Sequence, residues 1–309
     1  MIYDLAIVGG GPAGISAGIY AARKKLNTIF ITKDWNTQSI VSSDIQNWIG
    51  EKSISGLELA NRLKSHLEHF AKDTVTISSG ETCTSISENK DKKIFTIDTS
   101  SKQYNAKAIL IATGSHRRKL DIEGAQKFEH RGLTYCASCD GLLYSGLDVV
   151  VVGGGNAAFE SASQLLAYCK TVTLINRSDN FRGDAVTIEN VSKHPNFKII
   201  KNAIPIEVKG DSMVESLVYE DAITKEKKEI KTSGIFVEIG ALPNTDFAKD
   251  IVNIDKYGKI VTDPKNQRTS TLGIWSAGDC TDGLYQQNNI AAGDGVKALE
   301  DIYLFLKTR

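Results

Sequence analysis

Two short glycine-rich segments constrain the fold of this chain more than any other feature. They read Gly-Gly-Gly-Pro-Ala-Gly from residue 9 and Gly-Gly-Gly-Asn-Ala-Ala from residue 153. Each follows an apolar run of strand length, at residues 4–8 or 148–152, and precedes a segment with helical character. In such a strand–turn–helix frame this pattern is typical of dinucleotide-binding folds, with alanine permitted at its last position. The chain therefore repeats one unit, and two units predict two dinucleotide cofactors that exchange electrons.

The glycines of the first unit have separate roles. Gly9 permits the tight turn, Gly11 lets the backbone approach a pyrophosphate, and Gly14 lets helix and strand pack closely. The helix that follows presents unpaired N–H groups to the phosphates. An acidic partner for the ribose is expected about 20 residues further on, and Asp34 lies near that place. An ordinary surface aspartate is an equally good interpretation of Asp34.

The second unit indicates which nicotinamide the chain uses. After the predicted strand at residues 171–175, an acidic residue would accept a hydrogen bond from a free ribose 2′-hydroxyl. The chain instead has Arg177, followed by Arg182, and arginine suits a 2′-phosphate through charge-assisted bonds. A solvated basic turn is the alternative, because Asp179 and Asp184 dilute the charge. The pattern favours NADPH over NADH.

A pair of cysteines, Cys136 and Cys139, stands shortly before the second unit. Two thiols at this spacing can close and reopen a disulfide, and the adjacent Asp140 could give or take the proton. Half of a zinc site and simple burial are the alternatives. A zinc site needs about four ligands, whereas the other cysteines are scattered singly and no histidines show paired ligand spacing. The pattern favours redox chemistry without a metal.

Length and composition narrow the class of protein. At 309 residues the chain suits two domains. It carries 37 basic and 37 acidic residues, so bulk charge indicates neither a nucleic-acid nor a membrane-surface partner. No apolar run approaches the roughly 20 residues that span a bilayer, and Met1 leads into a strand pattern without a basic leader. Five cysteines, an odd number, argue against a secreted disulfide framework, so we expect a cytoplasmic enzyme.

Hydrophobic periodicity predicts the remaining elements. Helices are expected at residues 15–24, 57–70, 159–168 and 290–306, and strands at 28–31, 75–77, 94–97 and 108–111. Strands and polar turns follow over residues 198–238, and a strand within 273–279 ends on Gly278 and Asp279. Asp279 could accept a hydrogen bond from a ribityl or ribose hydroxyl, or it could cap the helix that follows.

Four stretches together resemble the low-molecular-weight, bacterial-type thioredoxin reductases. They are the two glycine-rich turns, residues 135–141 with the Cys-Ala-x-Cys-Asp-Gly pattern, and residues 277–279. The resemblance covers essentially the whole chain. It implies an α/β fold of two Rossmann-like, three-layer ββα dinucleotide-binding domains, with the NAD(P)H-binding domain inserted in the FAD-binding domain. The implied boundaries are 1–115 and 243–309 for the two parts of the FAD-binding domain and 116–242 for the NAD(P)H-binding domain with the cysteine pair.

The resemblance also implies a function. Members of the family are homodimeric flavoproteins in which NADPH reduces FAD, the flavin reduces the cysteine disulfide, and the dithiol reduces thioredoxin. Carried over by position, Cys139 faces the flavin, Cys136 attacks the partner disulfide, and Asp140 moves the proton. The domains alternate between two orientations, for which the glycine-rich links could serve as hinges. A related reductase that serves another disulfide carrier, or takes electrons from another donor, is the alternative.

The same resemblance assigns cofactor-binding residues. Those expected at FAD are Gly9, Gly11, Pro12, Ala13, Gly14, Gln38, Asn47, Thr113, Gly114, Gly278, Asp279, Gln287 and Asn288. Those expected at NADPH are Gly153, Gly155, Asn156, Ala157, Ala158, Arg177 and Arg182.

The chain departs from the family pattern at four places. A family Gly-Gly-Gln-Leu reads Asn36-Thr37-Gln38-Ser39, His-Arg-Arg reads Asn176-Arg177-Ser178, Gly-His reads Gly240-Ala241, and Arg-Gln-Ala reads Gln286-Gln287-Asn288. Residues 277–281 are equally similar to the related peroxiredoxin-reductase flavoproteins.

Overall fold

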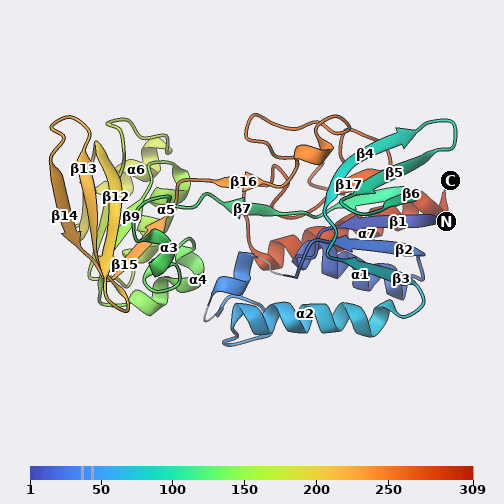
Figure 1. The fold of residues 1–309 in the computed structure, drawn as a ribbon, viewed down its shortest axis with the longest axis horizontal. Helices are drawn as coiled ribbons and strands as arrows, with labels where there is room; N and C mark the ends of the chain where they lie inside the picture. The colour runs from blue at the N-terminus through green and yellow to red at the C-terminus, as the bar shows by residue number, and fades with distance from the viewer. Residues whose placement is uncertain (36–37, 43–44, 309) are drawn as a thin grey trace.

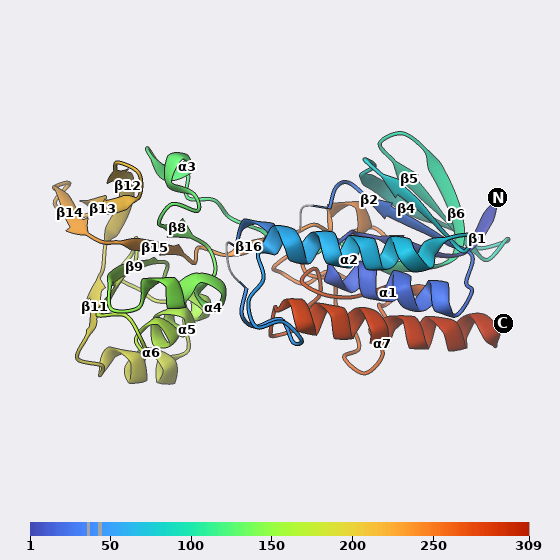
Figure 2. The same ribbon diagram turned by 90° about the horizontal axis from the view of Figure 1, so that it is seen from below.

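The computed structural model shows two α/β domains joined by a two-stranded ribbon (Figure 1). It describes residues 1–35, 38–42 and 45–308. Both chain ends lie in the first domain, and the middle of the chain forms the second (Figures 1 and 2). The ribbon pairs β7 (Ser115–Arg117) with β16 (Ala241–Pro243), and the expected domain boundaries fall within these two strands. The predicted architecture, an α/β domain inserted in another, is confirmed.

The first domain is built on a seven-stranded sheet in which parallel strands meet an antiparallel extension. The parallel strands are β1 (Ile2–Val8), β2 (Thr28–Thr32), β3 (Val75–Ser79), β6 (Gln103–Ile111) and β17 (Ile274–Ser276). The extension is the hairpin β4 (Cys83–Asn89) and β5 (Ile94–Thr99). Helices α1 (Pro12–Arg23), α2 (Gly56–Ala71) and α7 (Asn288–Lys307) lie together on one side of the sheet (Figure 2).

Side chains of β1 alternate between two cores, as the pleat of a strand requires. Leu5 and Ile7 pack with the helices, whereas Ala6 and Val8 pack on the opposite face with the antiparallel strands. Both faces of this strand are therefore buried, which explains why it reads as a continuous apolar run in the sequence. The glycine-rich turn leaves the sheet at the carboxyl end of this strand.

The second domain repeats the plan on a smaller scale. Its five-stranded sheet is parallel, in the order β11 (Phe197–Ile200), β10 (Thr171–Ile175), β9 (Asp148–Val152), β15 (Gly234–Val237) and β8 (Leu133–Thr134). A three-stranded antiparallel sheet accompanies it, formed by β12 (Ala203–Gly210), β13 (Val214–Asp221) and β14 (Lys227–Lys231). The helices are α3 (Ala125–Phe128), α4 (Ala137–Asp140), α5 (Asn156–Leu165) and α6 (Ala185–Ser192). Short 3₁₀ turns cover Gln38–Val41, Gly141–Tyr144 and Asp246–Ala248.

The strongly periodic elements lie where the sequence predicts them. The four predicted helices are observed as α1, α2, α5 and α7, with ends shifted by a few residues. Helix α5 begins earlier than expected, because the chain is helical directly after the glycine-rich turn. The elements that were not predicted include the polar strand β4 and the short helix α6, which Asp184 caps by accepting a hydrogen bond from Thr187 N.

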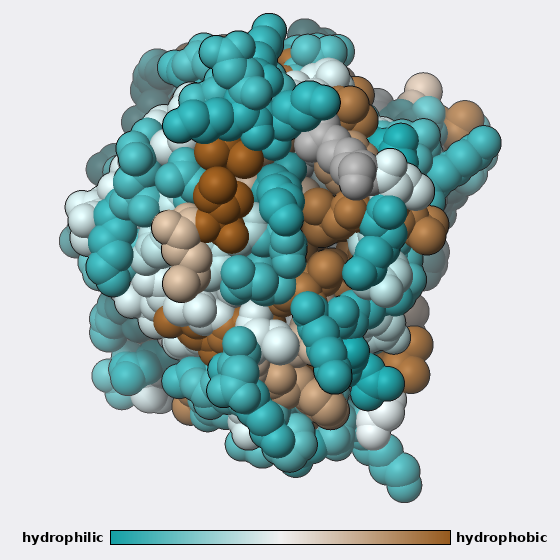
Figure 3. Space-filling view, turned by 90° about the vertical axis from the view of Figure 1, so that its right-hand side faces the viewer, coloured by the Kyte–Doolittle hydropathy of each residue, from teal (hydrophilic) through white to brown (hydrophobic). Residues whose placement is uncertain are grey.

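The outer end of the first domain carries both termini and offers no single apolar face. Hydrophilic residues interrupt the apolar ones across it (Figure 3). No helix in the described parts of the chain combines the length and apolarity that crossing a bilayer requires.

A buried carboxylate, Glu81, fastens the antiparallel layer to the parallel sheet. It is 6% exposed and accepts hydrogen bonds from Ser78 (2.6 Å), Thr99 (2.6 Å) and Tyr104 (3.0 Å), with Lys102 Nζ at 3.4 Å. Burial alone would raise the pKa of Glu81, but these hydrogen bonds outweigh burial and lower it from 4.5 to about 2. The charged form is therefore the one that stabilises the fold.

Glu81→Gln should lower the free energy of unfolding at neutral pH by about 1–3 kcal/mol, since bonds to a charged acceptor are lost. Because the folded-state pKa is depressed, the contribution is complete above the unfolded pKa near 4.5 and is lost as the pH falls toward 2. Urea denaturation at several pH values should show a steeper acid loss for the parent than for the variant. Equal slopes for the two proteins would contradict this role.

Candidate functional site

The two cysteines predicted to act together form a disulfide in the second domain. Cys136 and Cys139 are joined with a Cα–Cα distance of 5.3 Å, and helix α4 begins directly after Cys136. Both cysteines are half-buried. Their sulfurs are bonded to each other, so the pair does not form half of a zinc site in this state. Within the described residues no three His, Cys, Asp or Glu side chains cluster closely enough to hold a metal ion.

The other three cysteines are buried thiols, as their scattered positions suggest. Burial raises the pKa of Cys83 to about 12 and that of Cys169 to about 11, and it also raises the pKa of Cys280. A thiol with so high a pKa forms little thiolate at neutral pH, and the thiolate is the attacking species. The reactive sulfur chemistry of the chain is therefore concentrated in the disulfide.

Asp140 connects the disulfide to the first domain. Its Oδ2 accepts a short hydrogen bond from Thr134 Oγ1, which in turn accepts one from the backbone N–H of Cys136 (3.4 Å). Its Oδ1 accepts from Ser42 Oγ of the first domain (3.0 Å). Ser42 and Thr134 were not predicted, because hydrogen bonds between distant segments leave no local pattern in a sequence. One carboxylate thus contacts the cysteine loop and the neighbouring domain.

A small pocket of about 230 Å³ lies where the two domains meet at the disulfide. Cys139 lines it, with Gln46 and Asn47 from the first domain and Leu142 and Leu143 from the second. Ser138 also lines it, and Cys136 is not among the described residues of the wall. Cys139 is therefore the cysteine of the pair that borders the pocket shared with the first domain.

The first glycine-rich turn has the geometry of a phosphate cradle. Gly9 has φ +124°, and a Cβ there would lie 2.1 Å from Ala112 O, while a Cβ on Gly14 would lie 1.9 Å from Gly9 O. Gly11, the N-cap of α1, would place a Cβ in open space with no protein atom within 4 Å. The turn is thus closely packed on its protein side and open on the side where a pyrophosphate would lie. Pro12 and Ala13, which are also predicted to bind FAD, occupy the first positions of α1.

Asp279 lies beside that cradle, directly after Gly278. Burial raises the pKa of Asp279, and the positive charge of Arg117 partly offsets this rise. Gln38 Nε2 donates to Asp279 Oδ2 (3.3 Å) and to Ser115 Oγ (3.1 Å). A half-buried carboxylate at a strand end is suited to accept a hydrogen bond from a cofactor hydroxyl.

A carboxamide network joins the loop after Gln38 to the start of α7. Asn47 Nδ2 donates to Gln287 Oε1 (3.3 Å), and the Ser39 hydroxyl is bonded to the Asn288 carboxamide (2.8 Å). The structure thereby brings together predicted FAD residues that are about 240 positions apart in the sequence. Thr113 and Gly114, which are also predicted to bind FAD, lie just beyond the carboxyl end of β6. By contrast, Asp34 is exposed just beyond β2, and the family departure at Asn36 and Thr37 lies outside the described residues.

The second glycine-rich turn repeats the geometry of the first. Gly153 has φ +149°, and a Cβ there would lie 2.3 Å from Glu238 O, whereas a Cβ on Gly155 would meet no protein atom within 4 Å. Asn156 begins α5, and its Oδ1 accepts from Asp184 N (2.7 Å). The other predicted residues of this turn are the next two of α5, Ala157 and Ala158.

The loop after β10 lies against that turn. Arg182 N donates to Gly154 O (2.7 Å), which holds the loop on the turn. Asp179 pairs with Lys201 Nζ (3.0 Å), and Asp184 caps helix α6. The acids expected to dilute the positive charge are therefore engaged elsewhere. Within the described residues neither Arg182 nor Arg177 pairs with a carboxylate, and both are exposed.

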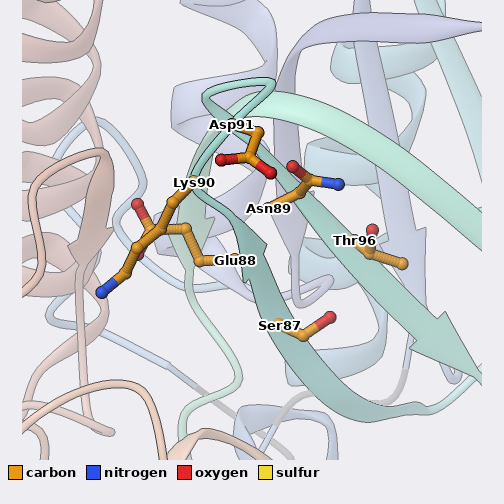
Figure 4. A pocket seen from close by; sticks show the side chains of 6 residues that line it. All are labelled: Ser87, Glu88, Asn89, Lys90, Asp91 and Thr96. Carbon is orange, nitrogen blue, oxygen red and sulfur yellow. The ribbon is translucent and has the colours of Figure 1, made fainter.

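A second hollow, about 450 Å³, lies outside this site. It is formed at the β4–β5 turn by a single hairpin, lined by Ser87, Glu88, Asn89, Lys90, Asp91 and Thr96 (Figure 4). None of these residues belongs to the disulfide, the glycine-rich turns or their partners. Of these two pockets, the smaller one between the domains is therefore the one that a residue of the disulfide lines.

Comparison with known proteins agrees with this geometry. The family described as Pyridine nucleotide-disulphide oxidoreductase matches residues 3–295. A Clostridium pasteurianum protein described as "34.2 kDa protein in rubredoxin operon" is 38% identical over 96% of this chain and 94% of its own length. One subunit of the Pseudomonas putida alkyl hydroperoxide reductase is 37% identical, and the match spans 96% of this chain but only 56% of that protein.

Two solved structures show the similarity in three dimensions. Thioredoxin reductase from Giardia duodenalis has a TM-score of 0.92 at 32% identity, with 99% of each chain covered. The Lactococcus lactis thioredoxin reductase, described as in the FR conformation, has a TM-score of 0.68 at the same 32% identity, with 99% of this chain and 100% of that chain covered. At equal identity and nearly equal coverage, the two structures therefore match this chain to different extents.

Two glycines of the second turn give a matched pair of variants, because Gly155 faces open space and Gly153 is packed against Glu238 O. Gly155→Ala should leave the fold intact but weaken pyridine-nucleotide binding by about tenfold or more, because its methyl group enters the phosphate space. Gly153→Ala should instead lower the free energy of unfolding by more than about 1 kcal/mol, since its φ is positive and its Cβ meets Glu238 O. Nucleotide titration and thermal unfolding of both variants would check this. Unchanged nucleotide affinity in Gly155→Ala would show that no phosphate binds there.

Proposed function

This chain belongs to the pyridine nucleotide-disulphide oxidoreductase family, and from that premise we propose that it is a thioredoxin reductase. Electrons pass from NADPH through FAD and the Cys136–Cys139 pair to the disulfide of thioredoxin or a thioredoxin-like protein. One observation carries the proposal: Cys139 lines the pocket between the domains, opposite Asn47 of the first domain. The disulfide thus adjoins the first nucleotide-binding fold, which would hold the flavin that reduces it.

Each cofactor has a cradle whose residues fit it. The turn at Gly11, with Asp279 and the carboxamide network, would hold FAD, and the turn at Gly155 would hold the pyridine nucleotide. Bound FAD supplies the link between a hydride donor and a disulfide, because it accepts two electrons from nicotinamide and can deliver them to an S–S bond. The protein itself orients the two cofactors and the disulfide, and its side chains donate and accept the protons.

The protein residues then divide the sulfur chemistry. Reduction breaks the Cys136–Cys139 bond and takes up two electrons and two protons, one of which Asp140 can supply. Cys136, as the thiolate, attacks the partner disulfide, forms a mixed disulfide and releases one partner thiolate, which takes up a proton. Cys139 attacks the sulfur of Cys136 next, which restores the internal disulfide and releases the second partner thiolate. Asp140 accepts and returns protons during these steps.

The choice of NADPH rests on the loop after β10. Arg177 and Arg182 lie exposed beside the glycine-rich turn, while Asp179 and Asp184 are occupied by Lys201 and by helix α6. Unpaired guanidinium groups favour a 2′-phosphate over a free hydroxyl. We also propose the homodimer that is usual in the family, which light scattering of the flavin-loaded protein would test.

A reductase for another disulfide carrier is the second candidate. The similarity to the Pseudomonas putida alkyl hydroperoxide reductase supports it, since that relative is as similar in sequence as the others. The two candidates share the same disulfide and cofactors and differ only in the partner. Turnover with thioredoxin and with other dithiol carrier proteins, measured at equal concentrations, would separate them.

Cys136→Ser and Cys139→Ser should each abolish reduction of a disulfide protein, by more than about a hundredfold, because each removes one partner of the exchange. Anaerobic bleaching of the flavin absorbance by NADPH should persist in both variants, since neither sulfur is needed for that step. Cys169→Ser is a matched control with a buried thiol and should turn over as the parent does. Parent-like turnover in the double variant would rule out the dithiol mechanism.

Arg177→Ala and Arg182→Ala should each raise KM for NADPH by about tenfold, through loss of a charge-assisted phosphate contact worth roughly 1–2 kcal/mol. KM for NADH should stay nearly constant, because NADH lacks the 2′-phosphate. Lys193→Ala, which removes a cation paired with Glu189 on α6, serves as the control. If the parent uses NADH as well as or better than NADPH, the 2′-phosphate assignment is wrong.

A further inference from the structure

One buried carboxylate is not used by the proposed electron transfer. Glu238 follows the end of β15, is 7% exposed, and accepts hydrogen bonds at both oxygens. Ser161 Oγ on α5 donates to Oε1 (2.7 Å), and Arg117 Nη1 on β7 lies 3.2 Å from Oε2. Burial raises the pKa of Glu238, and Arg117 opposes that rise. A charged side chain is rarely buried unless it is paired, and a buried pair often costs as much free energy as it contributes. Stability alone therefore does not account for the Arg117–Glu238 pair.

Arg117 lies between the two domains. Its direct partner, Glu238, belongs to the second domain, whereas its charge also lowers the pKa of Asp279 in the first domain, against the effect of burial. Arg117 itself is part of the ribbon that joins the domains (Figure 1). A single cation therefore interacts with one acid of each domain, and it is bonded to the acid of the second.

The ribbon has a potential hinge at each end. Gly114 precedes β7 with φ +63°, and Gly240 precedes β16 with φ +105°. A Cβ on Gly114 would meet no protein atom within 4 Å, and one on Gly240 would meet its nearest neighbour at 3.9 Å, so both glycines have room to turn. Asn244 ties the first-domain end by bonding to Thr113 O (2.9 Å). The Arg117–Glu238 pair spans the Gly240 end.

The domain arrangement matters for the proposed function, on which this inference rests. In this structure the contact between Ser42 and Asp140 and the pocket at Cys139 bring the disulfide to the first domain. A nicotinamide held at the second glycine-rich turn would need the same flavin, so the two groups must alternate there. Two relatives of equal sequence identity match this structure with TM-scores of 0.92 and 0.68.

We propose that Arg117 and Glu238 are positioning residues that hold the second domain in the orientation where Cys139 faces the first domain. The pair clamps the ribbon across Gly240, so it opposes rotation at that hinge. Glu238 O also lies against the Gly153 turn, so a bound pyridine nucleotide would adjoin the clamp. Loss of the pair shifts the orientation equilibrium toward the nicotinamide-facing arrangement.

Arg117→Met tests the clamp with the least disturbance, since it keeps an apolar stem on a half-buried ribbon residue. Small-angle X-ray scattering of the oxidised protein should match the present domain arrangement for the parent and depart from it for the variant. Anaerobic stopped-flow should show faster flavin reduction by NADPH and slower flavin reoxidation by the internal disulfide. If the ratio of disulfide-facing to nicotinamide-facing molecules changes from 9:1 to 1:1, flavin reduction becomes about fivefold faster and flavin reoxidation about twofold slower. A merely structural role would not move the two rates in opposite directions.

Glu238→Gln and the double variant complete the test. Glu238→Gln keeps an acceptor for Ser161 and removes only the charge, so it should reproduce Arg117→Met, and the double variant should add little. Arg268→Met is the control, because its ion pair with Asp301 (2.6 Å) lies wholly in the first domain. Unchanged scattering and rates in Arg117→Met and Glu238→Gln would overturn the proposal. If the parent flavin is not reduced by NADPH or NADH, the proposed function fails, whereas the scattering comparison still decides the role of the pair.

Discussion

The close approach of each glycine-rich turn to a neighbouring strand is the contact on which the site depends. At Gly9 the backbone is so near Ala112 O that a methyl group could not be accommodated, and Gly153 stands in the same relation to Glu238 O. This approach fixes the helix N-terminus at the carboxyl end of the sheet. The glycine two positions later then faces open space, where backbone N–H groups can meet phosphate oxygens. The same physical solution is used twice, so the chain has one cradle in each domain.

The disulfide is placed by a different kind of interaction. Helix α4 is a single short turn and has little stability of its own. Thr134, at the end of β8, donates to Asp140 and accepts from Cys136 N, so the sheet holds the cysteine loop at both of its ends. Ser42 then connects Asp140 to the first domain. The acid group of the site, Asp140, is therefore also the link between the cysteine loop and the first domain.

The sequence predicts whatever depends on local pattern. Both glycine-rich turns, the long helices and the cysteine pair are visible because strand, turn and helix follow one another directly. Strand β4 was missed because its alternation consists mostly of polar residues, and α6 because it is short. The bonds of Ser42 to Asp140 and of Arg117 to Glu238 span 98 and 121 positions, and no pattern in one sequence reports such pairs. Tertiary polar contacts are therefore the part of the site that required a structure.

The apolar cores explain why those few contacts carry so much weight. The clusters around Leu5 and Ala6 lie entirely in the first domain, and those around Val150 and Val151 lie entirely in the second. None of these cores crosses the ribbon, so the domains can turn relative to one another without disrupting any of the four. The contribution of these cores to folding stability is therefore the same in both domain orientations. What remains to choose an orientation is a set of polar contacts worth on the order of 1 kcal/mol each, which is the range in which a bound cofactor can reverse the balance.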